Sequence, residues 1–173
     1  MRHAISVLLQ NEVGALTRMT GMFSSRGYNI DSLNVAPTDD PTVSRVTLVV
    51  SGSDAAIEQL SAQLAKLVDV VNIHDMTLGD HFERELAIVK LKLATGGLAK
   101  AIAFAKKHGA EILDKAQASC TIQLTGRVSE IDAFVAEAGG VGEVSAVARS
   151  GSVAVSKGEV TLSSFDAHHH LSG

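Results

Sequence analysis

The chain has 173 residues, of which 46 % are hydrophobic and 20 % charged, and its formal net charge is −4. This length suits one ordinary domain or two small ones, and the hydrophobic fraction allows a packed core. The negative charge argues against a nucleic-acid or anionic-membrane partner, because no excess of Lys and Arg is available to neutralise phosphates. The single cysteine, Cys120, excludes an internal disulfide and a CxxC metal site.

The beginning of the chain runs directly into a strand-like pattern, without the apolar stretch of a signal peptide. No apolar run is long enough to span a membrane. A cytoplasmic protein is therefore expected, and the lone cysteine fits a reducing compartment.

The first half of the chain predicts the order strand, helix, strand, strand, helix, strand. A slip in the apolar alternation at Asp31-Ser32 indicates a β-bulge in the second strand, and Ser53 or Asp54 is placed to cap the second helix. The predicted strands cover residues 4–9, 28–36, 46–50 and 71–76, and the predicted helices follow the apolar stripes in 16–23 and 57–67.

The second half repeats this order after a polar linker at 79–84. Gly109 is placed to end its first helix, and Ser129 is placed to cap its second. The predicted strands cover residues 86–93, 111–114, 120–124 and 143–148, and the predicted helices include 98–105 and 131–138.

These patterns predict an α+β protein made of two ferredoxin-like βαββαβ domains. The expected boundaries are a first domain at 1–78, a linker at 79–84, a second domain at 85–158 and a flexible tail at 159–173. Several strands are apolar on both faces, for example at Val7-Leu8-Leu9. Because a small domain seldom leaves such a surface bare, a dimer is expected.

Catalytic and metal-binding patterns are weak. The run His168 to His170 lies in a Ser-rich end and suits a solvated tail better than a metal site. His74 and Asp75 would point to opposite faces of a strand, which argues against an acid–base pair. Cys120 has apolar neighbours along its strand and suits a buried, inert thiol. No catalytic residue and no metal ligand is predicted.

The segment between the first strand and the first helix, Asn11 to Leu16, has chemistry that suits an amino-acid ligand. The first turn of a helix offers unpaired backbone N–H groups to a carboxylate. Gly14 would let a ligand approach the backbone, and Asn11 offers both a donor and an acceptor. Asn29 could reach the same pocket from a neighbouring subunit. On spacing alone, however, Asn11 and Gly14 can equally be ordinary turn residues.

The run Ile5 to Leu16 resembles the beginning of ACT domains, which are amino-acid-sensing modules. The stretches Phe23 to Leu33 and Val35 to Asp39 resemble the regulatory small subunit of acetolactate synthase, also called acetohydroxyacid synthase. So do Leu67-Val68-Asp69-Val70, Arg84-Glu85-Leu86, Glu143-Val144 and Ala148-Arg149-Ser150-Gly151. The resemblance covers about residues 1–158, is densest in the first 90, and is looser in the second half.

This resemblance implies a non-catalytic subunit that binds a large catalytic subunit, raises its activity and confers feedback inhibition by valine or another branched-chain amino acid. Thiamine diphosphate, Mg²⁺ and FAD would belong to that partner, and this chain would hold no cofactor. The effector would lie between two ACT domains of a homodimer. The matching positions are Asn11, Val13, Gly14, Ala15 and Leu16 from one chain, and Asn29 and Ile30 from the other.

The second half begins its first helix from Ala94-Thr95-Gly96-Gly97, without an Asn, so no second amino-acid site is expected there. Two other functions remain open from the residues. One is a stand-alone amino-acid-sensing regulator of a different protein. The other is an RNA-binding module, which the lack of aromatic residues on the predicted central strands disfavours.

Overall fold

The computed structural model describes residues 1–162. It separates into two compact units. Of the described residues, the first contains Met1–Phe82 together with 152–162, and the second contains Glu83–Gly151. The His168–His170 run and most of the predicted tail lie outside the described residues.

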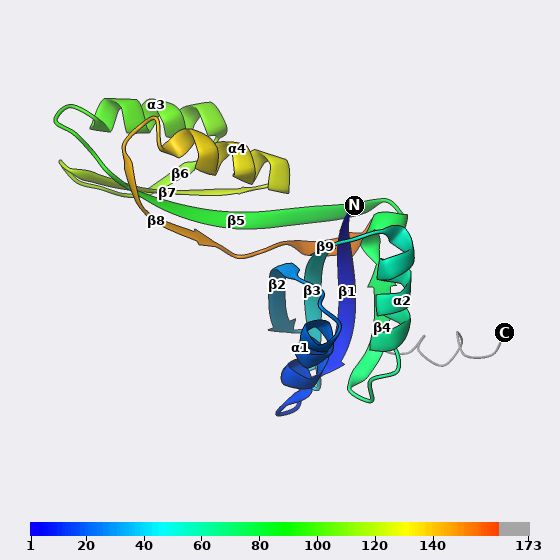
Figure 1. Cartoon of the computed structure of the whole chain (residues 1–173). Helices are drawn as coiled ribbons and strands as arrows, with labels where there is room; N and C mark the ends of the chain where they lie inside the picture. Colours follow the sequence, from blue (N-terminus) through cyan, green and yellow to red (C-terminus); the bar gives the residue numbers. More distant parts are fainter. Residues whose placement is uncertain (163–173) are drawn as a thin grey trace. The chain divides into compact units, whose positions relative to one another are not determined.

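The first unit is a four-stranded antiparallel sheet in the order β2-β3-β1-β4, with two helices on one face (Figure 1). This is the βαββαβ arrangement that the sequence predicts. Its elements are β1 (Arg2–Gln10), α1 (Ala15–Ser25), β2 (Ile30–Pro37), β3 (Val43–Ser51), α2 (Asp54–Leu64), β4 (Val70–Asp75) and the short 3₁₀ helix η1 (Met76–Leu78).

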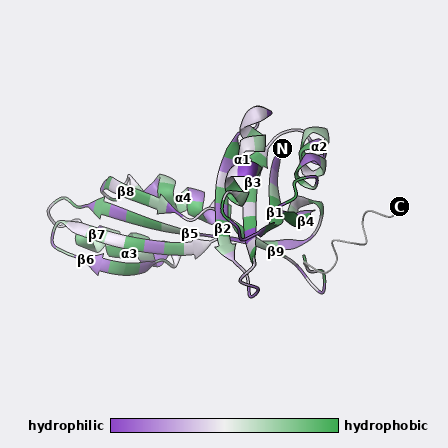
Figure 2. Ribbon diagram, turned by 90° about the horizontal axis from the view of Figure 1, so that it is seen from below, coloured by the Kyte–Doolittle hydropathy of each residue, from purple (hydrophilic) through white to green (hydrophobic). Residues whose placement is uncertain are grey.

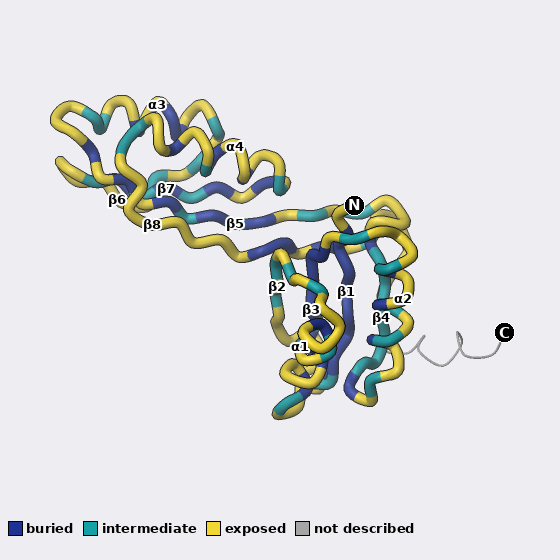
Figure 3. The backbone as a smooth tube through the Cα atoms, in the orientation of Figure 1, coloured by how far each residue is buried: buried dark blue, intermediate teal, exposed yellow. Residues whose placement is uncertain are grey.

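The core of this unit lies between the helices and the two central strands, which are buried along most of their length (Figure 3). Alternate residues of β1 and β3 face the helices, and one apolar stripe on each helix packs against them. The buried residues of this core include Ile5, Val7 and Leu9, then Val46, Leu48 and Val50, and on the helices Met19, Phe23, Ile57, Leu60 and Leu64.

Two local predictions are confirmed in this unit. The pairing of β2 with β3 shifts between Ile30 and Ser32, so the predicted bulge is present. Ser53, rather than Asp54, is the N-cap of α2, and its side chain accepts a hydrogen bond from the Ala56 N–H at 3.2 Å.

The second unit repeats the architecture, with a sheet path β6-β7-β5-β8 and two helices. Hydrophobic and hydrophilic residues alternate along its strands (Figure 2), as strands with one covered face require. Phe104 and Phe134 stack at the centre of its core, with ring centroids 5.1 Å apart. Its elements are β5 (His81–Lys92), α3 (Leu98–His108), β6 (Glu111–Lys115), β7 (Ser119–Gly126), α4 (Val128–Ala138) and β8 (Glu143–Arg149).

Two expectations about this half were wrong. Residues 81–84, expected in a linker, are the first part of β5. Three of these four residues are polar, but they extend a strand whose later residues are alternately buried, and pairing between strands favours the extended backbone over an open linker. Ser129 is not the cap of α4, which begins at Val128 with Arg127 as N-cap; the N–H of Arg127 donates to Glu130 Oε2 at 2.9 Å.

A ninth strand, β9 (Val153–Ser156), was not predicted. It pairs with β5, and residues 152–162 group with the first unit, although the sequence prediction assigned 85–158 to the second domain. Ala154 packs with Ala4, Val49 and Met76 on the sheet face opposite the helices. Arg45 Nη2 donates to the Ala154 carbonyl at 2.9 Å. The strand β9 therefore covers part of the apolar face of the first sheet that the helices do not cover.

Candidate functional site

The loop between β1 and α1, which carries most of the predicted effector residues, is exposed (Figure 3). Asn11 is anchored on the turn between β2 and β3. Its backbone N–H donates to the Thr42 carbonyl at 2.8 Å, and its Nδ2 donates to the Pro41 carbonyl at 3.0 Å. The hairpin turn thus fixes the position of the Asn11 carboxamide at the surface.

The amino-terminal end of α1 is open to solvent. Its N-cap is Gly14, with φ 84° in the left-handed region, and no side chain caps the helix. The first turn also lacks an acidic residue. Val13 is fully exposed and Leu16 is 37 % exposed, whereas Ala15 is buried. Backbone N–H groups of the first turn, beside two exposed apolar side chains, suit a small ligand that carries a carboxylate and an apolar side chain.

An ion pair lies behind this loop. Arg18 donates from Nε to Asp69 Oδ2 at 2.7 Å and from Nη2 to Asp69 Oδ1 at 2.9 Å. The Asp69 side chain is only 5 % exposed. Hydrogen bonding from Arg18 lowers the pKa of Asp69 from its ordinary value, so the carboxylate is ionised near neutral pH. A Cβ on Gly14 would lie 2.8 Å from Arg18 Nη1, so the guanidinium packs against the glycine.

The structure does not bring Asn29 and Ile30 to this loop. Ile30 pairs with Val50 at one end of β3, whereas Gln10 pairs with Val43 at the other end. These two β3 positions are seven residue steps apart, which spans roughly 23 Å. The other predicted effector residues, Asn11, Val13, Gly14, Ala15 and Leu16, lie together on the loop. One chain therefore presents the predicted site as two separated halves.

β2 is an outer strand of its sheet. Leu33 and Val35 pair with Leu48 and Val46, which face the helices, and they are 36 % and 38 % exposed. An edge strand with exposed apolar side chains is suited to pairing with another strand.

The second unit offers a different environment at the equivalent place. α3 follows Gly97, where an added Cβ would meet the Ala94 carbonyl oxygen at 2.9 Å, so the chain's own backbone fills the position. Cys120 is fully buried, and this burial raises the pKa of its thiol. The thiol is therefore protonated and unreactive at neutral pH, which agrees with the prediction of an inert cysteine.

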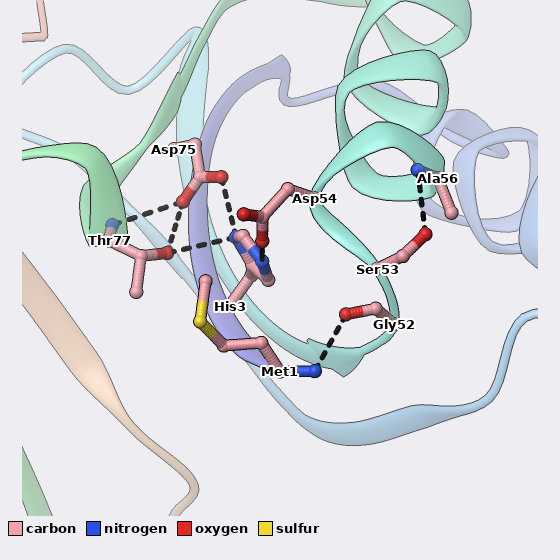
Figure 4. A network of polar contacts seen from close by, with 8 residues as sticks. All are labelled: Met1, His3, Gly52, Ser53, Asp54, Ala56, Asp75 and Thr77. Carbon is pink, nitrogen blue, oxygen red and sulfur yellow. Dashed lines mark hydrogen bonds and ion pairs between the residues drawn. The ribbon is translucent and has the colours of Figure 1, made fainter.

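A polar network that sequence reasoning missed surrounds His3, which is 1 % exposed (Figure 4). His3 Nδ1 lies 2.8 Å from Asp75 Oδ2, and Nε2 lies 3.1 Å from Asp54 Oδ1. Thr77 adds hydrogen bonds to both Asp75 and His3. Asp75 thus pairs with His3 on β1 rather than with its neighbour His74. The network ties together β1, the first turn of α2 and the end of β4, and no local sequence pattern indicates these partners.

Among residues 1–162, no group of three or more His, Cys, Asp or Glu side chains is placed to hold a metal ion. In the same part of the chain, no helix is long and apolar enough to cross a membrane.

Comparisons with known proteins agree with this architecture. The family model described as the AHAS small subunit-like ACT domain matches residues 5–90, and the model for the small subunit of acetolactate synthase matches residues 84–158. The acetolactate synthase isozyme 3 small subunit of Escherichia coli (strain K12) is 44 % identical over 92 % of this chain and 98 % of that protein. The acetolactate synthase small subunit of Haemophilus influenzae is 42 % identical over 94 % of this chain and 99 % of its own length.

A solved structure gives the same result for the fold. The crystal structure of the acetolactate synthase small subunit from Thermotoga maritima superposes with a TM-score of 0.83 at 29 % identity, covering 92 % of this chain and 99 % of that one. The two family models together span nearly all of the described residues. The chain therefore belongs to the acetolactate synthase small-subunit family, with an ACT domain as its first unit.

Proposed function

We propose that this chain is the non-catalytic regulatory subunit of an acetolactate synthase, acting in branched-chain amino-acid synthesis. It binds the catalytic large subunit, raises its activity and confers feedback inhibition by valine or another branched-chain amino acid. Thiamine diphosphate, Mg²⁺ and FAD belong to the large subunit in this proposal. The setting is the cytoplasm. Support comes from the similarity to acetolactate synthase small subunits over nearly the whole chain and from the open loop at the beginning of α1.

The observation that best supports an effector site between two chains is the separation of the β1–α1 loop from Asn29 and Ile30 within one chain. If β2 pairs with β2 of a second copy in an antiparallel, two-fold arrangement, the Ile30 end of one strand lies beside the Pro37 end of the other. Pro37 pairs with Ser44, next to the Val43 position that pairs with Gln10. Asn29 of the second copy then comes close to the loop that holds Asn11. The homodimer thus completes the site.

The chemistry of the completed site suits an aliphatic amino acid. The N–H of Ala15 donates to the Glu12 carbonyl at 3.2 Å, so the N–H groups that follow it in the first turn of α1 receive the carboxylate. The Asn11 and Asn29 carboxamides serve the ammonium and carboxylate groups. Val13, Leu16 and Ile30 contribute apolar surface for the effector side chain. All of these residues come from unit 1, so the second unit is left for packing or large-subunit contact.

The test is reconstitution with the cognate large subunit. The chain alone should not condense pyruvate, and its addition should raise the activity of the large subunit and make it sensitive to valine. Asn11→Ala should weaken valine inhibition on the order of tenfold, because an exposed hydrogen-bonding group is lost without damage to the core. Asn72→Ala, on the opposite edge strand β4, is the matched control and should keep wild-type inhibition.

The possible outcomes separate the parts of the proposal. An absence of stimulation by the wild-type chain would contradict the regulatory function. Stimulation with unchanged valine inhibition in Asn11→Ala would leave the function standing and refute the assignment of the pocket. Valine binding by calorimetry, without any binding to the large subunit, would favour the alternative of a stand-alone ACT regulator of another protein.

A further inference from the structure

The loop between β1 and α1, called the effector loop below, is held at both ends by Asp69, which lies far from it in the sequence. The backbone carbonyl of Asp69, just before β4, accepts the N–H of Gln10 at 2.8 Å, where β1 ends. The carboxylate of Asp69 accepts both hydrogen bonds from Arg18, whose guanidinium packs against Gly14. Asp69 therefore bridges residue 10, where the loop leaves the sheet, and residue 14, where the helix begins.

The position of Arg18 follows from the helix geometry. Arg18 stands one helical turn after Gly14, and helical side chains lean toward the amino-terminal end of their helix, so its guanidinium falls beside the glycine. Gly14 has no Cβ, which leaves the space that Arg18 Nη1 occupies. Asp69 then fixes the guanidinium by two parallel hydrogen bonds, an arrangement that restricts its orientation more than a single bond would.

The contacts that link Asp69, Arg18 and Gly14 hold the beginning of α1 in place of a side-chain cap. α2 begins with a side-chain cap from Ser53, whereas α1 has none. The orientation of the first turn of α1, which offers N–H groups to the effector, thus depends on contacts made behind it. On the other side of the loop, Asn11 is fixed by the carbonyls of Pro41 and Thr42.

We infer that Asp69 is a positioning residue of the effector site, acting through Arg18 and Gly14 to hold the β1–α1 loop in its ligand-binding conformation. The inference rests on the proposed function, because it takes this loop as the effector site. Asp69 itself does not contact the effector. Its side chain is almost fully buried, and both of its oxygens are taken by Arg18.

The experiment is calorimetric titration of the full-length chain with L-valine at 25 °C, together with thermal unfolding of each variant. Asp69→Asn has the same shape and leaves Arg18, which is half exposed, free to be solvated. We expect valine affinity to fall on the order of tenfold, the scale of a lost charge-assisted hydrogen bond. Adding Arg18→Gln to Asp69→Asn should cause no further loss, because the two residues act as one unit.

The second unit supplies a matched control. Glu85 is also 5 % exposed and also accepts two hydrogen bonds from an arginine, Arg149, at 2.8 and 3.0 Å. Glu85→Gln should lower the unfolding temperature, as loss of any such pair does, and leave valine affinity at the wild-type value. Asp69→Asn, in contrast, should lower both.

Each result has a defined meaning. A wild-type dissociation constant in Asp69→Asn, with a lowered unfolding temperature, would reduce the pair to a structural role and overturn the inference. A further loss of affinity on adding Arg18→Gln would also overturn it, since Arg18 would then act on the effector independently of Asp69. Absence of valine binding by the wild-type chain would instead contradict the proposed function.

Discussion

Gly14→Ala tests the geometry at the beginning of α1. Gly14 has φ 84°, and an L-residue in the left-handed region loses about 1–2 kcal/mol relative to its ordinary conformations. The added Cβ would also lie 2.8 Å from Arg18 Nη1, so the guanidinium must move away from it. We expect the free energy of unfolding, measured by urea denaturation, to fall by more than the conformational cost alone.

Gly27→Ala provides the reference for that cost. Gly27 follows the same helix with φ 73°, and an added Cβ there meets nothing within 4 Å. The difference between the two variants measures what it costs to displace Arg18 from its place against Gly14. Equal losses in the two variants would refute the packing of Arg18 on the glycine. Gly14→Asp is less informative, because its carboxylate would compete with Asp69 for Arg18.

Two further predictions concern association and acid stability. Val35→Lys should convert the proposed dimer to a monomer in sedimentation experiments, because it places a charged side chain on the apolar surface that two paired β2 strands would bury together. Leu113→Lys, on the edge strand β6, should leave the dimer intact, and a dimeric Val35→Lys chain would contradict pairing through β2. Arg18 lowers the pKa of Asp69 in the folded chain. The pair therefore stabilises the fold fully at pH values above the pKa of Asp69 in the unfolded chain, about 4. This stabilisation is lost as the pH falls through the lower pKa that Asp69 has in the folded chain. The difference in unfolding free energy between wild type and Asp69→Asn should therefore be constant at neutral pH and narrow below about pH 4, and a difference that does not change with pH would contradict this.

Features that depend on neighbouring residues could be predicted from the sequence. The apolar alternation of β1 and β3 and the stripes of α1 and α2 reflect a local period, and the bulge at Asp31-Ser32 showed as a slip in that period. The position of the effector loop was also predictable, because Gly14 stands where a strand pattern changes to a helix pattern. The family resemblance also rested on local runs of residues, which were densest in the first 90 residues.

The remaining features depend on contacts between residues that are far apart in the chain. Nothing local indicates that Asp69 meets Arg18, that His3 meets Asp75, or that Ala154 returns to the first sheet across 109 residues from Arg45. These contacts form because a folded sheet must satisfy its buried polar groups and cover its apolar face with whatever part of the chain passes nearby.

For the candidate site, the sequence by itself determined which residues have the right chemistry, because a helix start, a glycine and an exposed Asn are local features. Only the tertiary structure decided how these residues are arranged. Antiparallel pairing placed Asn11 and Asn29 at opposite ends of one sheet, and it also brought Asp69 behind Gly14. Strand register and the packing of distant segments determine how far Asn11 lies from Asn29 and Asp69 from Gly14, and the spacing of neighbouring residues does not specify either.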